Sequence, residues 1–305
     1  MGTTLPTDLQ QLLQFYESQR DNLPEEFCHG EGTLREVGFF SMQTFQQHLN
    51  NPLLRPEWVH IKTAGRDVML DQFFSKKLVQ RRPLQFIDKA KINEEIAKGG
   101  AIVLEGVDIL DSSVNAFCGH LDNKLPCGLS NSVVFFSQHD NEAYSGHCDA
   151  DDVLVVQLAG KKVWQLFEPQ QRRYLGITNL SEQKLGPVAH EVEMNSGDAL
   201  YVRAGVPHRC LTPDAFSLHM SFDLIDRTPG VDVISKEANR QYLQACELPY
   251  EPGSKVVDRY IELLSSPQFK ANLSAETLQT RMELIEFRKE LSRASGVDAL
   301  AKFIQ

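Results

Sequence analysis

The 305-residue sequence predicts a mainly β fold, an antiparallel barrel or sandwich flanked by helices. Three observations predict this class. Short runs of β-branched and aromatic residues, separated by Gly, Asn, Asp or Pro, fill the middle of the chain. Apolar residues at helical spacing dominate both ends. The hydrophobic content of 42% and the charged content of 24% are ordinary values for a globular protein.

Residues 1–98 are expected to be mostly helical and to pack on the barrel. Within Asp8–Tyr16, leucines and a tyrosine recur at helical spacing, which predicts a first helix. Met42–Leu49 is the second candidate helix. Lys91–Lys98 is the third, and the glycines that follow it end the helix.

Residues 99–226 form the expected barrel. The predicted strands are 101–104, 133–137, 153–158, 163–167, 199–202 and 216–224. The segment Leu158–Lys162 contains a glycine followed by two lysines, so we expect a tight hairpin turn there between two strands.

Residues 227–305 return to a helical period. Val256–Leu264 is one predicted helix, and a longer one runs from an N-cap at Ser274 to Gly296. We expect this part to be a dimerisation module that makes a homodimer. The alternative is a helical layer that only covers the barrel.

Charge and composition exclude several classes of protein. The chain carries 31 Lys+Arg against 41 Asp+Glu, a net charge of -10, which argues against a general polyanion binder. A local basic patch at Lys76, Lys77, Arg81 and Arg82 is the exception. No apolar run approaches the ~18 residues of a membrane span, and the N-terminus lacks a secretory signal. The 6 cysteines show no CxxC spacing, so we expect free thiols in a reducing, cytoplasmic setting.

The most informative motif is an imidazole and a carboxylate two residues apart. His147 and Asp149 precede the predicted strand 153–158, and in an extended segment they point to the same face. His208 lies 59 residues after Asp149 and follows the strand 199–202. Two imidazoles and one carboxylate on one face of a metal leave positions open for a co-substrate and O2, as in non-haem Fe(II) oxygenases. An HxD pair alone is weak, because such residues more often cap or cover strand ends.

Two further features support a polar barrel interior. Lys162 lies fifteen residues after His147, across the predicted hairpin. The last predicted strand alternates, and one of its faces carries Ser217, His219, Ser221 and Asp223. His219 would then contact a ligand or be a satisfied core histidine.

The sequence here resembles the JmjC-type branch of the cupin superfamily, the Fe(II)- and 2-oxoglutarate-dependent oxygenases. The resemblance covers about a third of the chain and lies in HCDADDVLVVQLAGKKVWQLFEP, GDALYVRAGVPH and SLHMSFDL. It is strongest to the ribosomal oxygenases, which hydroxylate ribosomal proteins. It implies a double-stranded β-helix (jelly-roll cupin) core.

The resemblance also assigns residues. It places the iron ligands at His147, Asp149 and His208, and the basic residue for the distal carboxylate of 2-oxoglutarate at Lys162. A buried ammonium facing a carboxylate is a strong pair, which agrees with that role. Without the resemblance, Lys162 would be taken for a solvated turn lysine.

The chain departs from the family at three places. Asp223 stands where relatives use a small polar residue beside 2-oxoglutarate, so we expect it to pair with a cation or turn away, with Ser221 as the substitute. Phe135 stands where relatives often have a tyrosine, and Tyr144 is expected to compensate. Arg203 replaces a proline and either reaches the mouth of the site or lies on the surface.

The expected reaction couples oxidative decarboxylation of 2-oxoglutarate to hydroxylation of a C–H bond by Fe(II) and O2. The resemblance implies a protein or peptide side chain as substrate. Alternatives with the same chemistry are a tRNA base, a small metabolite, a peptide natural product and an N-methyl-lysine that is demethylated. A non-catalytic, metal-binding cupin scaffold is the alternative from another class.

Overall fold

The computed structural model describes most of the first 225 residues and a few later segments. The described residues are 5–22, 24, 26–51, 54–63, 66–68, 73–125, 129–138, 144–168, 178–179, 185–213, 215–225, 239–240, 258, 261–272, 279 and 282–283. The chain divides into two compact units. One contains residues 1–121 and 130–224, and the other contains residues 122–129 and 225–305.

The described helices of the first unit lie among the earlier strands, and its elements described after α5 are strands. The α-helices are α1 (Thr7–Asn22), α2 (Met42–Leu49), α3 (Lys89–Ala97), α4 (Val107–Leu110) and α5 (Ser112–Asp122), with a 3-10 turn at Pro56–Trp58. The earlier strands are β1 (Phe27–Gly30), β2 (Val59–Thr63), β3 (Arg66–Val68), β4 (Phe74–Val79), β5 (Arg82–Ile87), β6 (Gly100–Leu104) and β7 (Leu129–Ser137). The later strands are β8 (His147–Cys148), β9 (Asp152–Phe167), β10 (Thr178–Asn179), β11 (Val188–Asn195), β12 (Ala199–Val202), β13 (His208–Leu211) and β14 (Ser217–Ile225).

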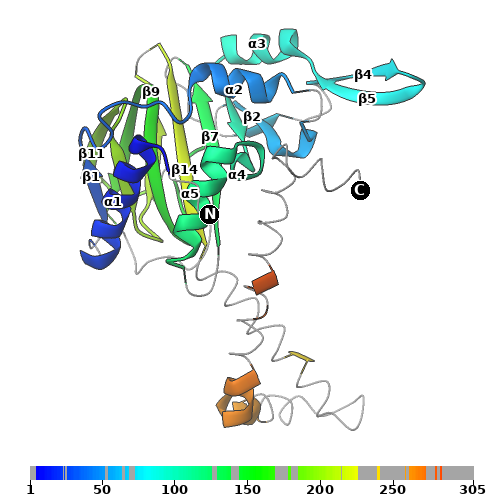
Figure 1. Ribbon diagram of the computed structural model, residues 1–305. Helices are drawn as coiled ribbons and strands as arrows, with labels where there is room; N and C mark the ends of the chain where they lie inside the picture. The colour runs from blue at the N-terminus through cyan, green and yellow to red at the C-terminus, as the bar shows by residue number, and fades with distance from the viewer. Residues whose placement is uncertain are drawn as a thin grey trace. The chain divides into compact units, whose positions relative to one another are not determined.

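One long strand, β9, links two groups of strands (Figure 1). Its first half pairs with β12 and β14, and the sheet continues from β14 through β7, β6 and β2 to β3. Its second half pairs with β11 and β13, and β13 continues to β8 and β10. Apart from β4 and β5, which pair only with each other among the described strands, the strands of the first unit therefore form the antiparallel barrel-like core that the sequence predicts.

The bend in β9 corrects the predicted hairpin. Residues 158–162 are not a turn, because the strand continues without interruption from Asp152 to Phe167. Gly160 has φ +67, and the Lys161 N–H donates to the Phe216 carbonyl at 3.2 Å. Gly160 is paired with Ser217, and the register with β14 shifts just before it, between Leu218 and His219, which leaves Leu158 as a bulge. Gly160 thus lies beside a bulge where one strand passes between two sheets, a use of glycine that resembles a turn in sequence.

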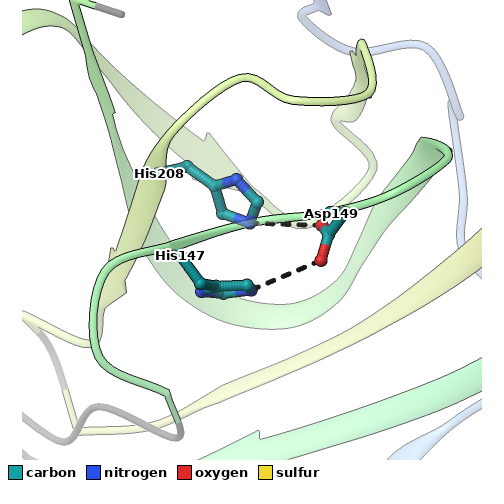
Figure 2. Close-up of side chains that lie close together, drawn as sticks. All are labelled: His147, Asp149 and His208. Atoms are coloured by element: carbon teal, nitrogen blue, oxygen red, sulfur yellow. Dashed lines mark ion pairs between the residues drawn. The ribbon is translucent and has the colours of Figure 1, made fainter. Parts of the chain in front are cut away.

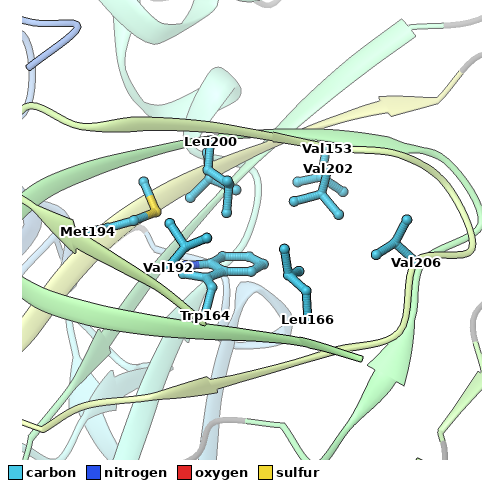
Figure 3. Packing of buried hydrophobic residues seen from close by; sticks show 9 residues of the cluster. Val153, Trp164, Leu166, Val192, Met194, Leu200, Val202 and Val206 are labelled. Carbon is cyan, nitrogen blue, oxygen red and sulfur yellow. The ribbon is translucent and has the colours of Figure 1, made fainter. Parts of the chain in front are cut away.

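The two halves of β9 enclose an apolar cluster (Figure 3). Val153 and Val155 come from the first half, whereas Trp164 and Leu166 come from the second. Met194 of β11 is fully buried among them. Side chains from both groups of strands therefore meet in one core, as expected when two sheets pack face to face.

Helices cover the outer face of the larger sheet (Figure 1). The Phe117 ring of α5 meets the Phe222 ring of β14 edge to face, with centroids 4.8 Å apart. Phe45 of α2 packs against Phe136 of β7, with centroids 6.0 Å apart. The apolar face of β14 is thus directed towards helices, which leaves the face that carries His219 for the interior.

The first 98 residues contain the three predicted helices but are not mostly helical. Strands β1 to β5 lie between the helices. These strands are short and lack a regular alternation of apolar and polar residues. For example, Lys62 of β2 is only 7% exposed although it is charged, and most of β4 is exposed. Strand β1 pairs with the distant β12 and β2 with the distant β6, whereas β4 and β5 pair with each other. A local pattern cannot reveal such partners.

Several predictions concern residues outside the described segments. The helix from Ser274 to Gly296 lies largely there, whereas helical residues are described at 261–265 and 267–272. The dimerisation module and the boundaries at 98 and 226 stay predictions. The described cysteines, Cys28, Cys118, Cys148 and Cys210, are free thiols. In the described part of the chain, no helix is both long enough and apolar enough to span a membrane.

Replacing Gly160 by alanine tests the bend in β9. An added Cβ would clash with the Phe216 carbonyl oxygen, whereas Gly32, with φ +57, has nothing within 4 Å of an added Cβ. Gly32→Ala should cost only the left-handed backbone penalty, about 1–2 kcal/mol. Gly160→Ala should cost about 1–3 kcal/mol more, because the backbone must move to relieve the clash. Urea unfolding measures both variants, and equal losses of unfolding free energy would contradict the close backbone contact at Gly160.

Candidate metal centre

Strand pairing brings the three predicted ligands together (Figure 2). β8 and β13 are antiparallel, and His208 lies directly opposite His147 in their register. Asp149 follows immediately after β8, and its side chain points towards both rings in Figure 2. Residues from two distant parts of the sequence thus share one side of the barrel.

The ligand atoms lie close enough to share one ion. His147 Nε2 is 3.6 Å from Asp149 Oδ1, and His208 Nε2 is 3.5 Å from Asp149 Oδ2. All three ligand atoms lie within 4.8 Å of one another. Metal bonds to histidine and carboxylate are about 2.0–2.2 Å long, so neighbouring donors around one ion are separated by roughly 3 Å. Small side-chain rotations would complete the coordination.

Backbone carbonyls orient both imidazoles. His147 Nδ1 lies 2.9 Å from the Ser145 carbonyl, and His208 Nδ1 lies 3.0 Å from the Val206 carbonyl. A carbonyl can only accept, so each Nδ1 carries the proton and each Nε2 lone pair faces the shared point. Histidines that bind a metal typically donate the N–H of their other ring nitrogen to a fixed acceptor in this way.

The surroundings keep His147 neutral. Burial, followed by the nearby His208, lowers the pKa of His147 to about 4, although Asp149 acts in the opposite direction. A neutral imidazole is the form that binds a metal. The Trp164 ring stacks on His208 with centroids 5.2 Å apart, whereas the Asp149 side chain is 30% exposed. The site is therefore closed on the His208 side and open at the aspartate.

Lys162 lies in the interior, not in a solvated turn. Its side chain is 1% exposed, and its Nζ donates to Ser137 Oγ at 2.9 Å and to Thr212 Oγ1 at 2.8 Å. The two hydroxyls are also 2.7 Å apart, so they can exchange donor and acceptor roles. The continuous course of β9 beyond Gly160 carries this ammonium into the barrel.

Sequence reasoning missed Ser137 and Thr212. Ser137 ends a strand that the sequence predicts, but a single terminal serine gives no signal of its own. Thr212 follows β13, four residues after His208. The sequence offered only the position of each residue at or just after the end of a strand.

Three buried polar atoms near these groups have no hydrogen-bond partner within the described structure. They are Gln157 Oε1, Trp164 Nε1 and His219 Nδ1. Gln157 lies opposite His219 in the pairing of β9 with β14. His219 stacks on Phe135 at 4.8 Å and meets Trp164 edge to face at 6.1 Å. Burial, then the charge of Lys162, lowers the pKa of His219 well below its usual range.

Asp223 was expected to pair with a cation or to turn away, and no cation is among the described groups that act on its carboxyl group. Its pKa is raised to about 7, first by burial and then by the negative charges of Asp149, Asp151 and Glu105. The Asn131 side chain donates to it and partly offsets this effect. Ser221, the predicted substitute, is 6% exposed and lies opposite Val155 of β9. A carboxyl group with a raised pKa thus stands near the aspartate ligand.

Tyr144 lies beside the metal centre. Its ring centroid is 5.5 Å from that of His147 and 6.1 Å from that of Phe135. Lys62 Nζ of β2 lies 4.2 Å from the centre of the Tyr144 ring. Tyr144, which was predicted to compensate for a missing tyrosine on β7, therefore lies beside Phe135. It also contacts Lys62, a second buried lysine that the sequence did not indicate.

Arg203 neither reaches the mouth of the site nor lies free on the surface. Its Nε is 3.3 Å from an Asp152 carboxylate oxygen, and its guanidinium donates to the Pro24 carbonyl at 3.2 Å. Asp152 also accepts from the Tyr201 hydroxyl at 2.6 Å and from the Ala204 N–H at 2.7 Å. These contacts hold the turn that leads to His208, so Arg203 and Asp152 are structural.

Comparison with known proteins agrees with this geometry. The family model of the JmjC domain matches residues 109–230. The bifunctional lysine-specific demethylase and histidyl-hydroxylase NO66 of Dictyostelium discoideum is 27% identical over 148 residues, which are 47% of this chain and 29% of that protein. Ribosomal oxygenase 2 of Mus musculus is 29% identical over 176 residues, 56% of this chain and 38% of that protein.

A solved structure shows the same fold. The ribosomal oxygenase YcfD of Escherichia coli, in complex with cobalt and 2-oxoglutarate, superposes with a TM-score of 0.51 at 12% identity. The match covers 86% of this chain and 70% of the other. It bears out the predicted cupin core, whereas the matched regions span well under half of the two curated relatives. The chain contains a JmjC domain on a cupin fold and is related to the ribosomal oxygenases.

Proposed function

We propose that this protein is an Fe(II)- and 2-oxoglutarate-dependent oxygenase that hydroxylates a side chain of a ribosomal protein. The observation that carries the proposal is the convergence of His147, Asp149 and His208 within 4.8 Å. Two nitrogens and one carboxylate form the ligand set of non-haem Fe(II) oxygenases. Bound there, Fe(II) would supply the O2 activation that couples decarboxylation of 2-oxoglutarate to C–H hydroxylation.

The chain's own residues orient and shield the site. The Ser145 and Val206 carbonyls fix the ring positions, so that the two Nε2 atoms face the ion without rearrangement. Trp164 covers the ring of His208 and excludes water from that side. Because Asp149 is partly exposed, a substrate would approach from the aspartate side.

The interior also fits a dicarboxylate. Lys162 is a buried cation, and burying a charge is costly unless an opposite charge or strong hydrogen bonds compensate it. A carboxylate at Lys162 could also accept from the hydroxyls of Ser137 and Thr212. The unpartnered nitrogens of Trp164 and His219 offer further donors. We infer that Lys162 holds the distal carboxylate of 2-oxoglutarate, with Tyr144 and Ser221 as neighbouring wall residues.

A protein substrate is supported by the relatives and by charge. The Mus musculus relative is named a ribosomal oxygenase, and the Dictyostelium discoideum relative a histidyl-hydroxylase. Ribosomal proteins are basic, and this chain has a net charge of -10. Mass spectrometry of ribosomal proteins from cells with and without the gene should show the loss of one oxygen atom on one side chain. Unchanged ribosomal proteins would contradict this substrate class.

Demethylation is the second candidate, because the Dictyostelium discoideum relative is also named a lysine-specific demethylase. Hydroxylation of an N-methyl group releases formaldehyde, whereas hydroxylation of a C–H bond in a side chain does not. Incubation with a methyl-lysine peptide therefore separates the two outcomes. Formaldehyde in step with succinate would favour demethylation.

Removing a ligand should abolish metal binding and turnover together. In His147→Ala and Asp149→Ala, Co(II) affinity measured by titration should fall more than about 100-fold, beyond the loss expected from an outer-shell change. Succinate formation should be lost as well. His120→Ala is the matched control, because His120 is exposed on α5. Normal succinate formation by either ligand variant would refute the assignment.

Replacing Lys162 should affect the co-substrate and spare the metal. Lys162→Met removes a charged hydrogen bond, which is worth about 1.5–3 kcal/mol, so the 2-oxoglutarate requirement should rise about 10- to 100-fold. Co(II) affinity should stay within about twofold. Lys161→Met is the control, because Lys161 is paired with Glu193 at 2.8 Å. A parallel loss of Co(II) binding would argue against co-substrate anchoring.

A further inference from the structure

The hairpin of β4 and β5 is set apart from the rest of the first unit. The two strands pair with each other and with no other described strand. In Figure 1 the hairpin extends away from the larger sheet, beyond α3. A two-stranded hairpin without a covering layer is marginally stable in water, so such an arm is more useful as a contact surface than as a structural support.

The charge of the hairpin is opposite to that of the chain. Residues 74–87 contain Lys76, Lys77, Arg81 and Arg82 and no acidic residue, in a chain with a net charge of -10. All four cationic side chains are exposed. Concentrating cations on a projecting arm gives a surface that attracts a polyanion while the rest of the molecule repels it.

The tip of the hairpin keeps a cation in an unfavourable backbone conformation. Gln80 and Arg81 have φ 49 and φ 66. Two-residue hairpin loops of this kind favour Asn-Gly, because only such residues adopt positive φ at low cost. Observed strain of this type is a recognised marker of function. Here it retains the Arg81 guanidinium at the tip.

One face of the hairpin combines cations with an aromatic ring. In the pairing of β4 with β5, Ser75 lies opposite Phe86 and Val79 lies opposite Arg82, which places Lys77, Arg82 and Phe86 on the same face. Lys77 Nζ lies 5.9 Å from the centre of the Phe86 ring. Cations that track a backbone and an aromatic ring on which bases stack are the two elements of single-strand binding.

We propose that the Phe74–Ile87 hairpin is a docking surface for single-stranded RNA. The proposal rests on the proposed function, because a ribosomal protein substrate is found together with RNA. An anionic membrane is less suited to this surface. Leu78 is 77% exposed and Val79 is 41% exposed, but consecutive strand residues point to opposite faces and do not form one apolar wedge.

The test compares charge-matched variants of the full chain. One variant replaces Lys76, Lys77, Arg81 and Arg82 by glutamine. The control replaces four other exposed cations, Arg35, Arg55, Lys91 and Lys98, and so has the same net charge. Fluorescence anisotropy with a labelled uridine oligomer of about 12 nucleotides measures binding. The hairpin variant should bind about tenfold more weakly or worse, with a salt slope shallower by about 2 to 3, and the control within about twofold of the parent.

Further arms separate the outcomes. Leu78→Ser should leave RNA affinity unchanged. If the parent protein does not bind RNA but binds phosphatidylserine vesicles, and Leu78→Ser loses that vesicle binding, the surface is a membrane contact and the proposal is overturned. Equal RNA binding by hairpin variant and control would also overturn it. Succinate formation is measured in parallel. Hairpin-dependent RNA binding without oxygenase activity would refute only the proposed function, whereas activity without hairpin-dependent RNA binding would refute only the docking surface.

Discussion

The antiparallel contact between β8 and β13 sets His147 opposite His208, and the metal centre depends on it. In both histidines, Nδ1 faces the carbonyl of the residue two positions earlier, so each ring is oriented by its own backbone. The two Nε2 atoms then face Asp149 from neighbouring strands. A slip of one residue in this register would turn one imidazole to the opposite face and leave two ligands.

The bent strand β9 gives the barrel two chemically different regions. Before Gly160 it contributes Val153 and Val155 to an apolar core, and after Gly160 it carries Lys162 to the hydroxyls of Ser137 and Thr212. Trp164 belongs to both regions, since it packs in the core and stacks on His208. A single strand therefore couples the stability of the core to the placement of a buried cation near the candidate metal centre. In such an interior a carboxylate of the co-substrate could join the hydrogen bonds that Lys162 makes with the two hydroxyls.

The sequence predicted the ligands better than the elements that hold them. His147, Asp149 and His208 were predicted from residue type and spacing together with the family resemblance, and the structure brings the three side chains together. The bend at Gly160 was mistaken for a turn, since both use a glycine with positive φ. Strands β1 and β2 were missed because distant partners form them. Asp223 was misjudged because its neighbouring carboxylates come from loops whose approach depends on the tertiary fold.

X-ray absorption spectroscopy of the Fe(II)-loaded protein tests the shared metal centre most directly, because it reports the ligand types around the iron itself. Two imidazole nitrogens at about 2.1 Å, with light oxygen ligands completing the shell, are expected. Addition of 2-oxoglutarate should change the oxygen ligands and leave both imidazoles in place. A spectrum with one imidazole, with none, or with sulfur ligands would show that His147, Asp149 and His208 do not hold the ion.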